Sequence, residues 1–288
     1  MGISLLVPFR ANGRGDSRVR SWRWVKKRWA TLLPEAELCV GTDDGGRPFS
    51  KSVAVNDAFA KSTGDMLVIA DADSWVEREQ LLTGLERAAY YEHLVVPWWT
   101  AYRLTRQDSL HIMTLDPAEP NPITRTMKEN AAGTGPSPAS GAMVLIIQRR
   151  SFERVGGFDP RFRGWGSEDV SFANACWTLL GRNEYSMGES YALHHPQPTT
   201  KDGMRVWKDD KGQLNTALYE RYRKATGHPT LMSVICGEHP VGQTPIGPSP
   251  TLNYDELVEL PDMDVNNPPP PTIAHEAVID YGDTRVTI

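Results

Sequence analysis

The sequence has few cysteines and no long apolar run. Its 288 residues include three cysteines, Cys39, Cys176 and Cys236, an odd number with wide spacing. Neither a disulfide framework nor a zinc site of paired cysteines is indicated. Charged residues interrupt every apolar stretch before the roughly 18–20 residues that a membrane-spanning helix needs. The N-terminus does not have the pattern of a signal peptide, so we expect a cytoplasmic protein without a membrane span.

What remains is the composition of a soluble enzyme, with an uneven charge. The chain has 31 Lys+Arg against 36 Asp+Glu. Residues 229–288 hold nine of the acidic residues but a single basic one, Arg285, together with an unbroken proline run at 268–271. We therefore expect a folded domain over residues 1–228 and an acidic, proline-rich extension over residues 229–288. The composition of the extension favours an extended arm over a second core, lying either along the domain or toward a partner subunit, and the second arrangement would form a homo-oligomer through it.

The first third of the chain alternates between strand and helix patterns. Residues 3–7 form an apolar run that Pro8 ends, which predicts a buried strand. Further strands are predicted at residues 38–40 and 66–70, and a helix at residues 53–60. A first helix is predicted by apolar residues at three- and four-residue spacing, namely Val19, Trp22, Val25, Trp29 and Leu32. This order predicts an α/β fold with a mostly parallel central sheet and helices on both faces.

The middle of the chain is less regular. A helix at residues 77–91 and a strand at 94–96 precede residues 97–139, which show no regular pattern and predict a long functional loop or lid. Within it, Trp98 and Trp99 are equally consistent with packing and with stacking on a sugar. Regular patterns return as a strand at 142–147, a short helix at 151–155 and a helix at 170–180.

The motif Asp71-Ala72-Asp73 follows the third predicted strand. Ligands of open parallel sheets bind at the carboxyl ends of the strands, where two carboxylates can hold a divalent cation beside a diphosphate. The same pattern also occurs as two solvated carboxylates that close a strand. Its position directly after an apolar strand favours the metal site.

A second motif places an aromatic ring and two carboxylates between a glycine turn and a helix. Trp165 offers a face for a sugar ring, and Glu168 or Asp169 at the start of a helix can serve as a general base. An acidic helix N-terminus that is favoured by the helix dipole is an equally good interpretation of these carboxylates alone.

A third motif is the histidine pair His194 and His195 at a predicted strand end. Because successive strand side chains face opposite sides, one of the two is expected to enter a site that contains Asp73. The pattern favours imidazole coordination of a metal, although a structural histidine is the usual default.

In chain order, these residues resemble the motif set of GT-A-fold glycosyltransferases, and most of all the β-1,4-galactosyltransferase type with its bacterial chondroitin-polymerase-like and phage relatives. The resemblance covers about residues 3–200. It rests on Val7-Pro8-Phe9-Arg10, Phe49-Ser50-Lys51 with Asn56, Asp71-Ala72-Asp73, residues 140–158, residues 164–169 and His194.

The resemblance implies a UDP-sugar donor and Mn²⁺ (or Mg²⁺) as cofactor, with the catalytic domain over residues 1–228. It implies that Asp73 and His194 bind the metal, with His195 as the reserve candidate. It also implies that Asp169 is the catalytic base, and that Glu168 and Trp165 contact the sugars. The residues that match nucleotide contacts are Pro8, Phe9, Arg10, Phe49, Lys51 and Asp71. Asp43 or Asp44, which close the second strand at the same edge, are expected to bond the uracil or the ribose.

The sequence departs from the family at two positions that bear on the site. Lys51 stands where the family usually has Arg, so it would meet a phosphate as a point charge. Ser167 replaces the usual second glycine of the Trp-Gly-Gly-Glu-Asp motif.

We expect a metal-dependent transfer of sugar to an acceptor hydroxyl of a glycan or a protein, with inversion. The alternatives are a retaining enzyme like the polypeptide N-acetylgalactosaminyltransferases, and a non-catalytic carbohydrate-binding or virion-associated protein on the same fold. A sugar-nucleotide pyrophosphorylase is disfavoured, because residues 11–15 make a poor phosphate-binding loop. No nucleic-acid partner is expected, since the basic run 18–28 is better explained as the solvated face of a helix.

Overall fold

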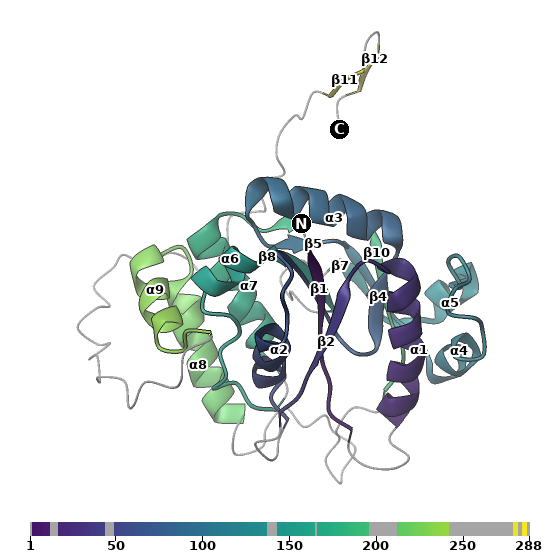
Figure 1. Cartoon of the computed structure of the whole chain (residues 1–288), viewed down its shortest axis with the longest axis horizontal. Helices are drawn as coiled ribbons and strands as arrows, with labels where there is room; N and C mark the ends of the chain where they lie inside the picture. The colour runs from purple at the N-terminus through teal and green to yellow at the C-terminus, as the bar shows by residue number, and fades with distance from the viewer. Residues whose placement is uncertain are drawn as a thin grey trace. The chain divides into compact units, whose positions relative to one another are not determined.

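The computed structural model describes residues 2–11, 17–43, 49–136, 143–164, 166–195, 212–241, 279–281 and 284–286. The chain divides into two compact units, Met1–Ile246 and Gly247–Ile288. The first unit contains the central sheet and the helices around it (Figure 1). In the described part of the second unit, β11 (Ile279–Tyr281) and β12 (Thr284–Val286) pair as an antiparallel hairpin.

A six-stranded sheet forms the centre of the first unit. Its strands, in spatial order, are β2 (Glu37–Gly41), β1 (Ile3–Pro8), β3 (Met66–Ala70), β8 (Val144–Gln148), β5 (Val95–Val96) and β9 (Glu184–Tyr185). Neighbouring strands are parallel except at β8, which runs antiparallel to both β3 and β5. The predicted α/β fold with a mostly parallel sheet is therefore confirmed.

The centre of this sheet is apolar on both faces. Every residue of β3 and of β8 is buried. Continuous apolar runs of this kind form when helices or a second layer cover both sides of a parallel sheet. The predicted strands at residues 3–7, 38–40 and 66–70 match β1, β2 and β3 to within one residue at each end.

Helices cover the sheet as the periodicity predicts. These helices are α1 (Ser17–Leu32), α2 (Lys51–Ala60), α3 (Arg78–Tyr91), α6 (Arg149–Arg154) and α7 (Glu168–Leu180). Trp22, Val25 and Trp29 of α1 are buried, so the predicted apolar stripe is the packed face of that helix. Contacts place α2 against β1 and β2, and α3 against β8 and β5 (Figure 1).

The prediction of a long irregular segment over residues 97–139 is wrong. The structure forms β6 (Thr100–Arg103), α4 (Arg106–Ile112), α5 (Arg125–Asn130) and β7 (Ala132–Pro136) there. The two helices have seven and six residues, too few for a helical period to show in the sequence. Each begins at a threonine whose hydroxyl accepts a backbone hydrogen bond, at Thr105 and at Thr124.

The two strands of this segment belong to a second sheet. Its order is β4 (Ser74–Val76), β10 (Glu189–Ala192), β6 and β7. β6 runs parallel to β10, its partner from about ninety residues further along the chain. Pairing at that separation leaves no local sequence signal, which explains why β6 and β7 were not predicted.

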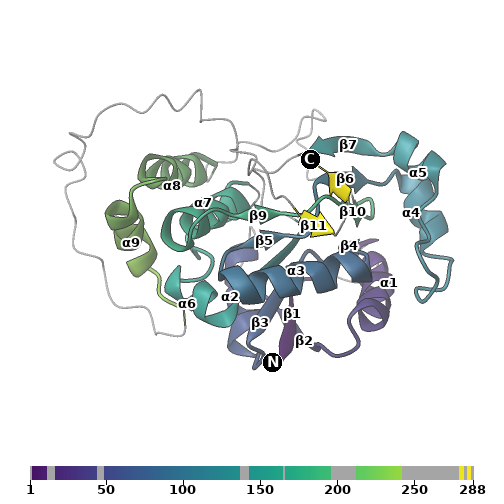
Figure 2. The same cartoon turned by 90° about the horizontal axis from the view of Figure 1, so that it is seen from above.

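Three helices pack together at one end of the first unit, opposite α4 and α5 (Figures 1 and 2). α8 (Gly212–Ala225) and α9 (Pro229–Gly237) contact each other and α7. Met232, Ile235 and Cys236 of α9 are buried. The compact unit therefore continues to Ile246, beyond the boundary expected after residue 228, because α9 has an apolar face that needs cover. The rest of the predicted extension, residues 242–278, lies outside the described residues.

Across the part of the chain that the structure describes, no helix is both long and apolar enough to span a bilayer.

Candidate active site

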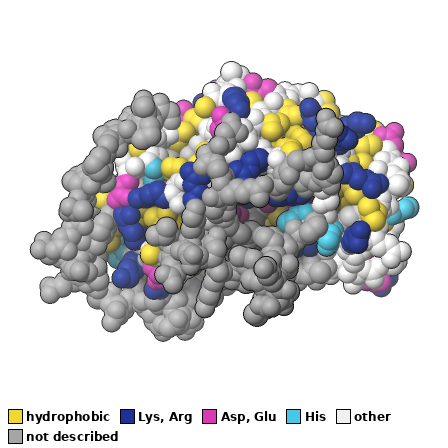
Figure 3. Space-filling view, turned by 90° about the horizontal axis from the view of Figure 1, so that it is seen from below, with side chains coloured by type: hydrophobic (Ala, Val, Ile, Leu, Met, Phe, Trp, Pro, Cys, Tyr) yellow, Lys and Arg dark blue, Asp and Glu magenta, His cyan; other side chains and the backbone are white. Residues whose placement is uncertain are grey.

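Three parallel strands bring the predicted residues to one edge of the sheet. β1 ends at Pro8 opposite Gly41, the last residue of β2, and β3 ends at Ala70 directly before Asp71. The carboxyl ends of parallel strands form the usual ligand-binding edge of such a sheet. Figure 3 views the molecule from the lower side of Figure 1, where these strands end, and Lys, Arg and His side chains gather on that face.

Lys51 lies between two of the predicted acidic residues. Its Nζ is 2.6 Å from Oδ1 of Asp71 and 2.8 Å from Oδ1 of Asp169. Lys51 is the first residue of α2, where the hydroxyl of Ser50 caps the helix by accepting a hydrogen bond from the Val53 N–H. Asp169 is the second residue of α7. The starts of two helices and the end of β3 therefore meet at one ammonium group.

Burial and crowding perturb the acidic groups around this ammonium. Burial raises the pKa of Asp169 well above its usual value, and the carboxylates of Glu168 and Asp71 raise it further, while Lys51 opposes the shift. Burial also raises the pKa of Glu168, again against the influence of Lys51. For Lys51, burial alone would lower the pKa, but the three carboxylates outweigh it and raise it. One cation thus faces three carboxylates, and the site has excess negative charge that a further cation would balance.

Asp73 and His195 form a second contact at this edge. Nε2 of His195 is 3.4 Å from Oδ2 of Asp73, whose Oδ1 accepts a hydrogen bond from the Ser74 hydroxyl at 3.0 Å. Burial raises the pKa of Asp73. A carboxylate oxygen and an imidazole nitrogen are ligands that Mn²⁺ accepts. Among the described residues, no group of three or more His, Cys, Asp or Glu side chains could hold a metal ion.

The two histidines lie in different surroundings. His194 is exposed, and its backbone N–H donates to the Ser109 hydroxyl at 2.7 Å. His195 is half-buried and lies beside Asp73. The alternation of side chains after β10 brings only one ring to Asp73, as the sequence predicts. This arrangement favours His195 over His194 as a metal ligand, which reverses the order that the resemblance implies.

The carboxylate of Asp43, a predicted nucleotide contact, is hydrogen-bonded to other residues of the protein. Its side chain is 1% exposed, and its Oδ2 accepts hydrogen bonds from the Ser50 N–H at 2.9 Å and from the Arg163 guanidinium at 3.0 Å. Arg10 donates to the Asp43 carbonyl at 3.0 Å. Asp43 therefore ties the end of β2 to the start of α2 and to the loop before α7. Asp44 lies outside the described residues.

The other predicted nucleotide contacts differ in exposure. The guanidinium of Arg10 lies over the Phe49 ring, 5.1 Å from its centre, and both side chains are partly exposed. Phe9 is half-buried and packs on Trp22 at 5.9 Å. Pro8 is buried as the last residue of β1. Arg10 and Phe49 thus lie against each other, and Pro8 is the fully buried member of this set.

The second acidic motif opens α7, as predicted. Glu168 and Asp169 are its first two residues, and Glu168 is 8% exposed. Trp165 lies outside the described residues, as do Ser140 and Gly141 of the resemblance.

The two adjacent tryptophans, Trp98 and Trp99, differ in burial. Trp98 is 1% exposed and donates its indole N–H to the Val144 carbonyl at 3.1 Å, so it is a core residue. Trp99 is half-buried and lies edge-on to Tyr185.

Two residues near the site carried no recognised signal in the sequence. Arg163, inside the acidic motif, pairs with Asp43, and Asn215 of α8 holds the backbone of Arg163. Arg163 stands directly before the Gly-Trp-Gly part of the motif, so its position was the available clue. Nothing in the sequence around Asn215 indicated a role.

Two stretches of the chain match glycosyltransferase families. Residues 45–156 match glycosyl transferase family 2, and residues 133–195 match the N-terminal domain of galactosyltransferase. The first match contains Lys51, Asp71 and Asp73, and the second contains Asp169 and His195. Among curated proteins, none matches the chain significantly.

Solved structures of several glycosyltransferases resemble the chain weakly. The catalytic domain of Drosophila beta1,4galactosyltransferase 7 in complex with xylobiose is 17% identical over 65% of this chain and 67% of that chain, with a TM-score of 0.36. The mannosyltransferase PcManGT from Pyrobaculum calidifontis, in complex with GDP-Man and Mn²⁺, is 16% identical over 82% of this chain and 68% of that chain, with a TM-score of 0.41. Glucosyl-3-phosphoglycerate synthase from Mycobacterium tuberculosis, in complex with Mn²⁺, UDP-glucose and phosphoglyceric acid, is 13% identical over 82% of this chain and 80% of that chain, with a TM-score of 0.42. Such low identities and TM-scores assign no donor, acceptor or metal to this chain.

The family matches show that the chain is a glycosyltransferase, and its described residues form an α/β fold with a mostly parallel central sheet. The similarity to galactosyltransferases is confined to residues 133–195, which include Glu168, Asp169 and the two histidines.

Proposed function

We propose that the chain transfers a sugar from a UDP-sugar to an acceptor hydroxyl, with a divalent metal and with inversion at the anomeric carbon. The arrangement of Lys51 carries this proposal. One ammonium contacts both Asp71, on the nucleotide side of the predicted site, and Asp169, the predicted base. The group that would meet the leaving diphosphate therefore lies next to the group that would take the acceptor proton.

Asp169 has the properties of a general base. Burial raises the pKa of its carboxyl group, and a carboxylate with a raised pKa is a stronger base toward a hydroxyl proton. Asp169 would accept the proton of the acceptor hydroxyl while that oxygen bonds to the anomeric carbon. The bond from that carbon to the diphosphate oxygen breaks at the opposite face, and UDP leaves with the bonding electron pair. A single displacement of this kind inverts the configuration.

The residues at the opposite side would hold the diphosphate. Lys51 and Arg10 place positive charge at the edge where the strands end, and Phe49 lies against Arg10. Asp73 and His195 would hold the metal together with oxygens of the diphosphate. When bound, a Mn²⁺ ion supplies Lewis-acid neutralisation of the charge on the leaving group.

The first experiment measures UDP release and transfer with purified protein. UDP-Glc, UDP-Gal, UDP-GlcNAc and UDP-GalNAc are each incubated with Mn²⁺ or with EDTA, and candidate glycan and protein acceptors are read by mass change. We expect turnover with one donor in Mn²⁺ only. Asp169→Asn should reduce it by about a hundredfold or more, whereas Glu129→Gln, an exposed carboxylate paired with Arg125, should not change it. Equal turnover in Asp169→Asn and wild type would refute the assignment of the base. The anomeric configuration of the product, read by NMR, separates inversion from retention.

A second experiment tests the metal ligands without turnover. The affinity for UDP is measured by calorimetry with Mn²⁺ and with EDTA. We expect His195→Ala and Asp73→Ala to weaken the Mn²⁺-dependent part by at least about tenfold, and His194→Ala to leave it near the wild-type value. Because the two histidines are adjacent, each serves as the control for the other. If His194→Ala alone weakened the Mn²⁺-dependent affinity for UDP, His194 would be the metal ligand, as the resemblance implies.

A further inference from the structure

The loop that precedes the predicted base has an unfavourable backbone conformation. Gly164 and Gly166 have φ angles of 74° and 108°, and Ser167 has a φ of 74°. Glycine adopts this region freely, but a serine there costs about 1 kcal/mol or more. Ser167 directly precedes Glu168 and Asp169 at the start of α7. The intrinsic backbone preference of Ser167 therefore does not stabilise this conformation of the loop, and contacts with residues far away in the chain must stabilise it.

Asn215 of α8 supplies such contacts. Its side-chain oxygen accepts a hydrogen bond from the Arg163 N–H at 3.1 Å, and its amide group donates to the Arg163 carbonyl at 2.8 Å. The same amide group lies 3.4 Å from the Gly166 carbonyl. Asn215 is 5% exposed, so water does not compete well for these bonds. A side-chain amide can accept from one backbone group and donate to another at the same place.

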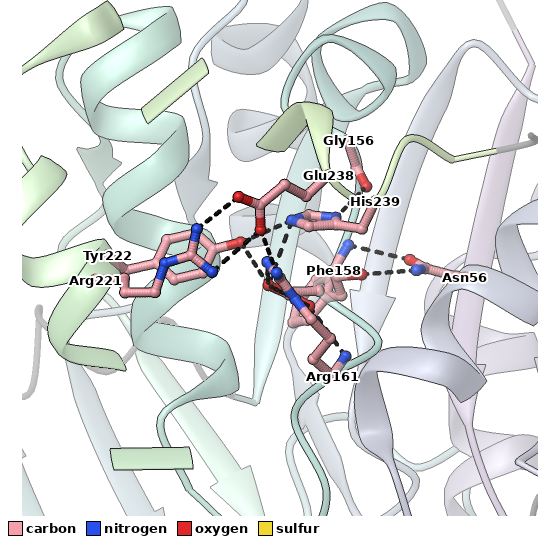
Figure 4. Close-up of polar contacts among 9 residues, drawn as sticks. Asn56, Gly156, Phe158, Arg161, Arg221, Tyr222, Glu238 and His239 are labelled. Carbon is pink, nitrogen blue, oxygen red and sulfur yellow. Dashed lines mark hydrogen bonds and ion pairs between the residues drawn. The ribbon is translucent and has the colours of Figure 1, made fainter. Parts of the chain in front are cut away.

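A buried polar cluster fixes α8 relative to the same loop. Tyr222 lies two helical turns after Asn215, on the same face of α8. Its hydroxyl is 3.0 Å from Oδ2 of Asp159 and 2.8 Å from Nε2 of His239. In Figure 4, Tyr222 contacts His239, and the guanidinium groups of Arg161 and Arg221 both pair with Glu238. The contact between Tyr222 and Asp159 fixes the position of α8. Asn215 of the same helix can therefore contact Arg163, four residues after Asp159.

The opposite side of the loop is bound to the nucleotide side of the site. The Arg163 guanidinium contacts Asp43 at 3.0 Å, and the Gly164 N–H donates to the Phe49 carbonyl at 2.9 Å. The Ser50 hydroxyl donates to the Phe162 carbonyl at 2.7 Å. The loop is thus held between the start of α2, which carries Lys51, and α8.

We infer that Asn215 is a positioning residue for sugar transfer, which sets the backbone of residues 162–164 and 166–167 so that Asp169 stays beside Lys51. The inference rests on the proposed function. Asn215 does not touch the reacting groups. It acts through the backbone of Arg163 and Gly166, from a helix that lies outside both stretches with glycosyltransferase matches.

The test compares Asn215→Ala with Asn56→Ala. Asn56 of α2 makes the same kind of contact with Phe158, which lies ten residues before α7. Its amide group donates to the Phe158 carbonyl at 2.7 Å, and its side-chain oxygen accepts from the Phe158 N–H at 3.0 Å (Figure 4). We expect Asn215→Ala to lower kcat by about tenfold to a hundredfold, because a displaced base is costly, with KM for the UDP-sugar changed by less than about threefold. Asn56→Ala should lower the stability to urea but change kcat much less. Wild-type kcat in Asn215→Ala, or an equal loss of kcat in both variants, would overturn the inference.

Hydrogen exchange separates this inference from the proposed function. Mass spectrometry of peptides that cover residues 162–169 reports the loop whether or not the protein turns over a UDP-sugar. We expect faster exchange there in Asn215→Ala than in wild type or Asn56→Ala, with α2 unchanged. If wild type shows no turnover but the loop exchanges faster in Asn215→Ala, the proposed function fails and the positioning of the loop is supported. Unchanged exchange in folded Asn215→Ala would refute the positioning.

Discussion

Replacing Lys51 by methionine tests whether one ammonium group holds the acidic site together. The Lys51 and Asp169 side chains are each 15% exposed, and that of Asp71 is 29% exposed, so solvent screens these pairs weakly. Methionine keeps most of the length of the side chain and removes the charge. Glu168 and Asp169 would then lie together without their nearest cation.

The expected loss of stability at neutral pH is about 3 kcal/mol, the lower end of the range for removing one partner of a buried ion pair. The loss should depend on pH. In the folded protein the pKa values of Asp169 and Glu168 are already above those of the unfolded chain, and Lys51 limits that rise. Without Lys51 they rise further, so the folded variant binds protons that the unfolded variant releases. Its stability should fall more steeply than that of wild type as the pH increases from about 5 to 8.

Urea unfolding followed by tryptophan fluorescence at pH 5.5 and pH 8, with EDTA present, measures this difference. Lys61→Met is the matched control. Lys61 pairs with Asp57 at 2.6 Å, but the two side chains are 49% and 34% exposed, so we expect a change below about 1 kcal/mol. A loss below about 1 kcal/mol in Lys51→Met at both pH values, or a loss that is larger at pH 5.5, would refute the reasoning.

Two further predictions concern buried groups away from the candidate site. Burial lowers the pKa of His239, against the influence of Asp159 beside it, so the unfolded chain binds this proton more tightly and stability is lost as the pH falls below about 6.5. Urea unfolding between pH 5 and 7.5 should show a smaller loss in His239→Gln than in wild type, and equal slopes would contradict the assignment. Cys39, Cys176 and Cys236 are buried with raised pKa values, that of Cys236 to about 12, mainly through burial. A thiol reagent such as DTNB should label none of them within minutes in the native protein and all three in urea, and rapid labelling of native protein would show that the packing around them opens.

Elements with many local signals were predictable. β1 and β3 are apolar runs, and α1 repeats apolar residues at helical spacing over sixteen residues. β6 and β7 have no such signal, because β6 is stabilised by pairing with β10 and β7 by pairing with β6, in each case across a long stretch of chain. α9 was assigned to the extension because its surroundings are rich in proline, although its own apolar face packs on α7 and α8.

The candidate site was predictable only as a set of residue types. Parallel strands that end at Pro8, Gly41 and Ala70 must present the residues that follow them at one edge, so the sequence could place Arg10, Asp43 and Asp71 together. It could not show that the Asp43 carboxylate accepts hydrogen bonds from Ser50 and Arg163, because the Arg163 contact depends on the path of a loop 120 residues away. The preference for His195 over His194 likewise depends on the twist of the chain after β10.

The sequence by itself determined the α/β class, the acidic pairs at the strand and helix ends, and the likeness to glycosyltransferases, because these follow from local periodicity and from residue types at fixed spacing. The tertiary structure alone decided which charges meet. Lys51 lies between Asp71 and Asp169, and Asn215 lies against Arg163, because packing of α2, α7 and α8 around the sheet brings together backbone positions that are far apart in the chain. Contacts of that kind depend on burial and on direction in space, which a linear pattern does not contain.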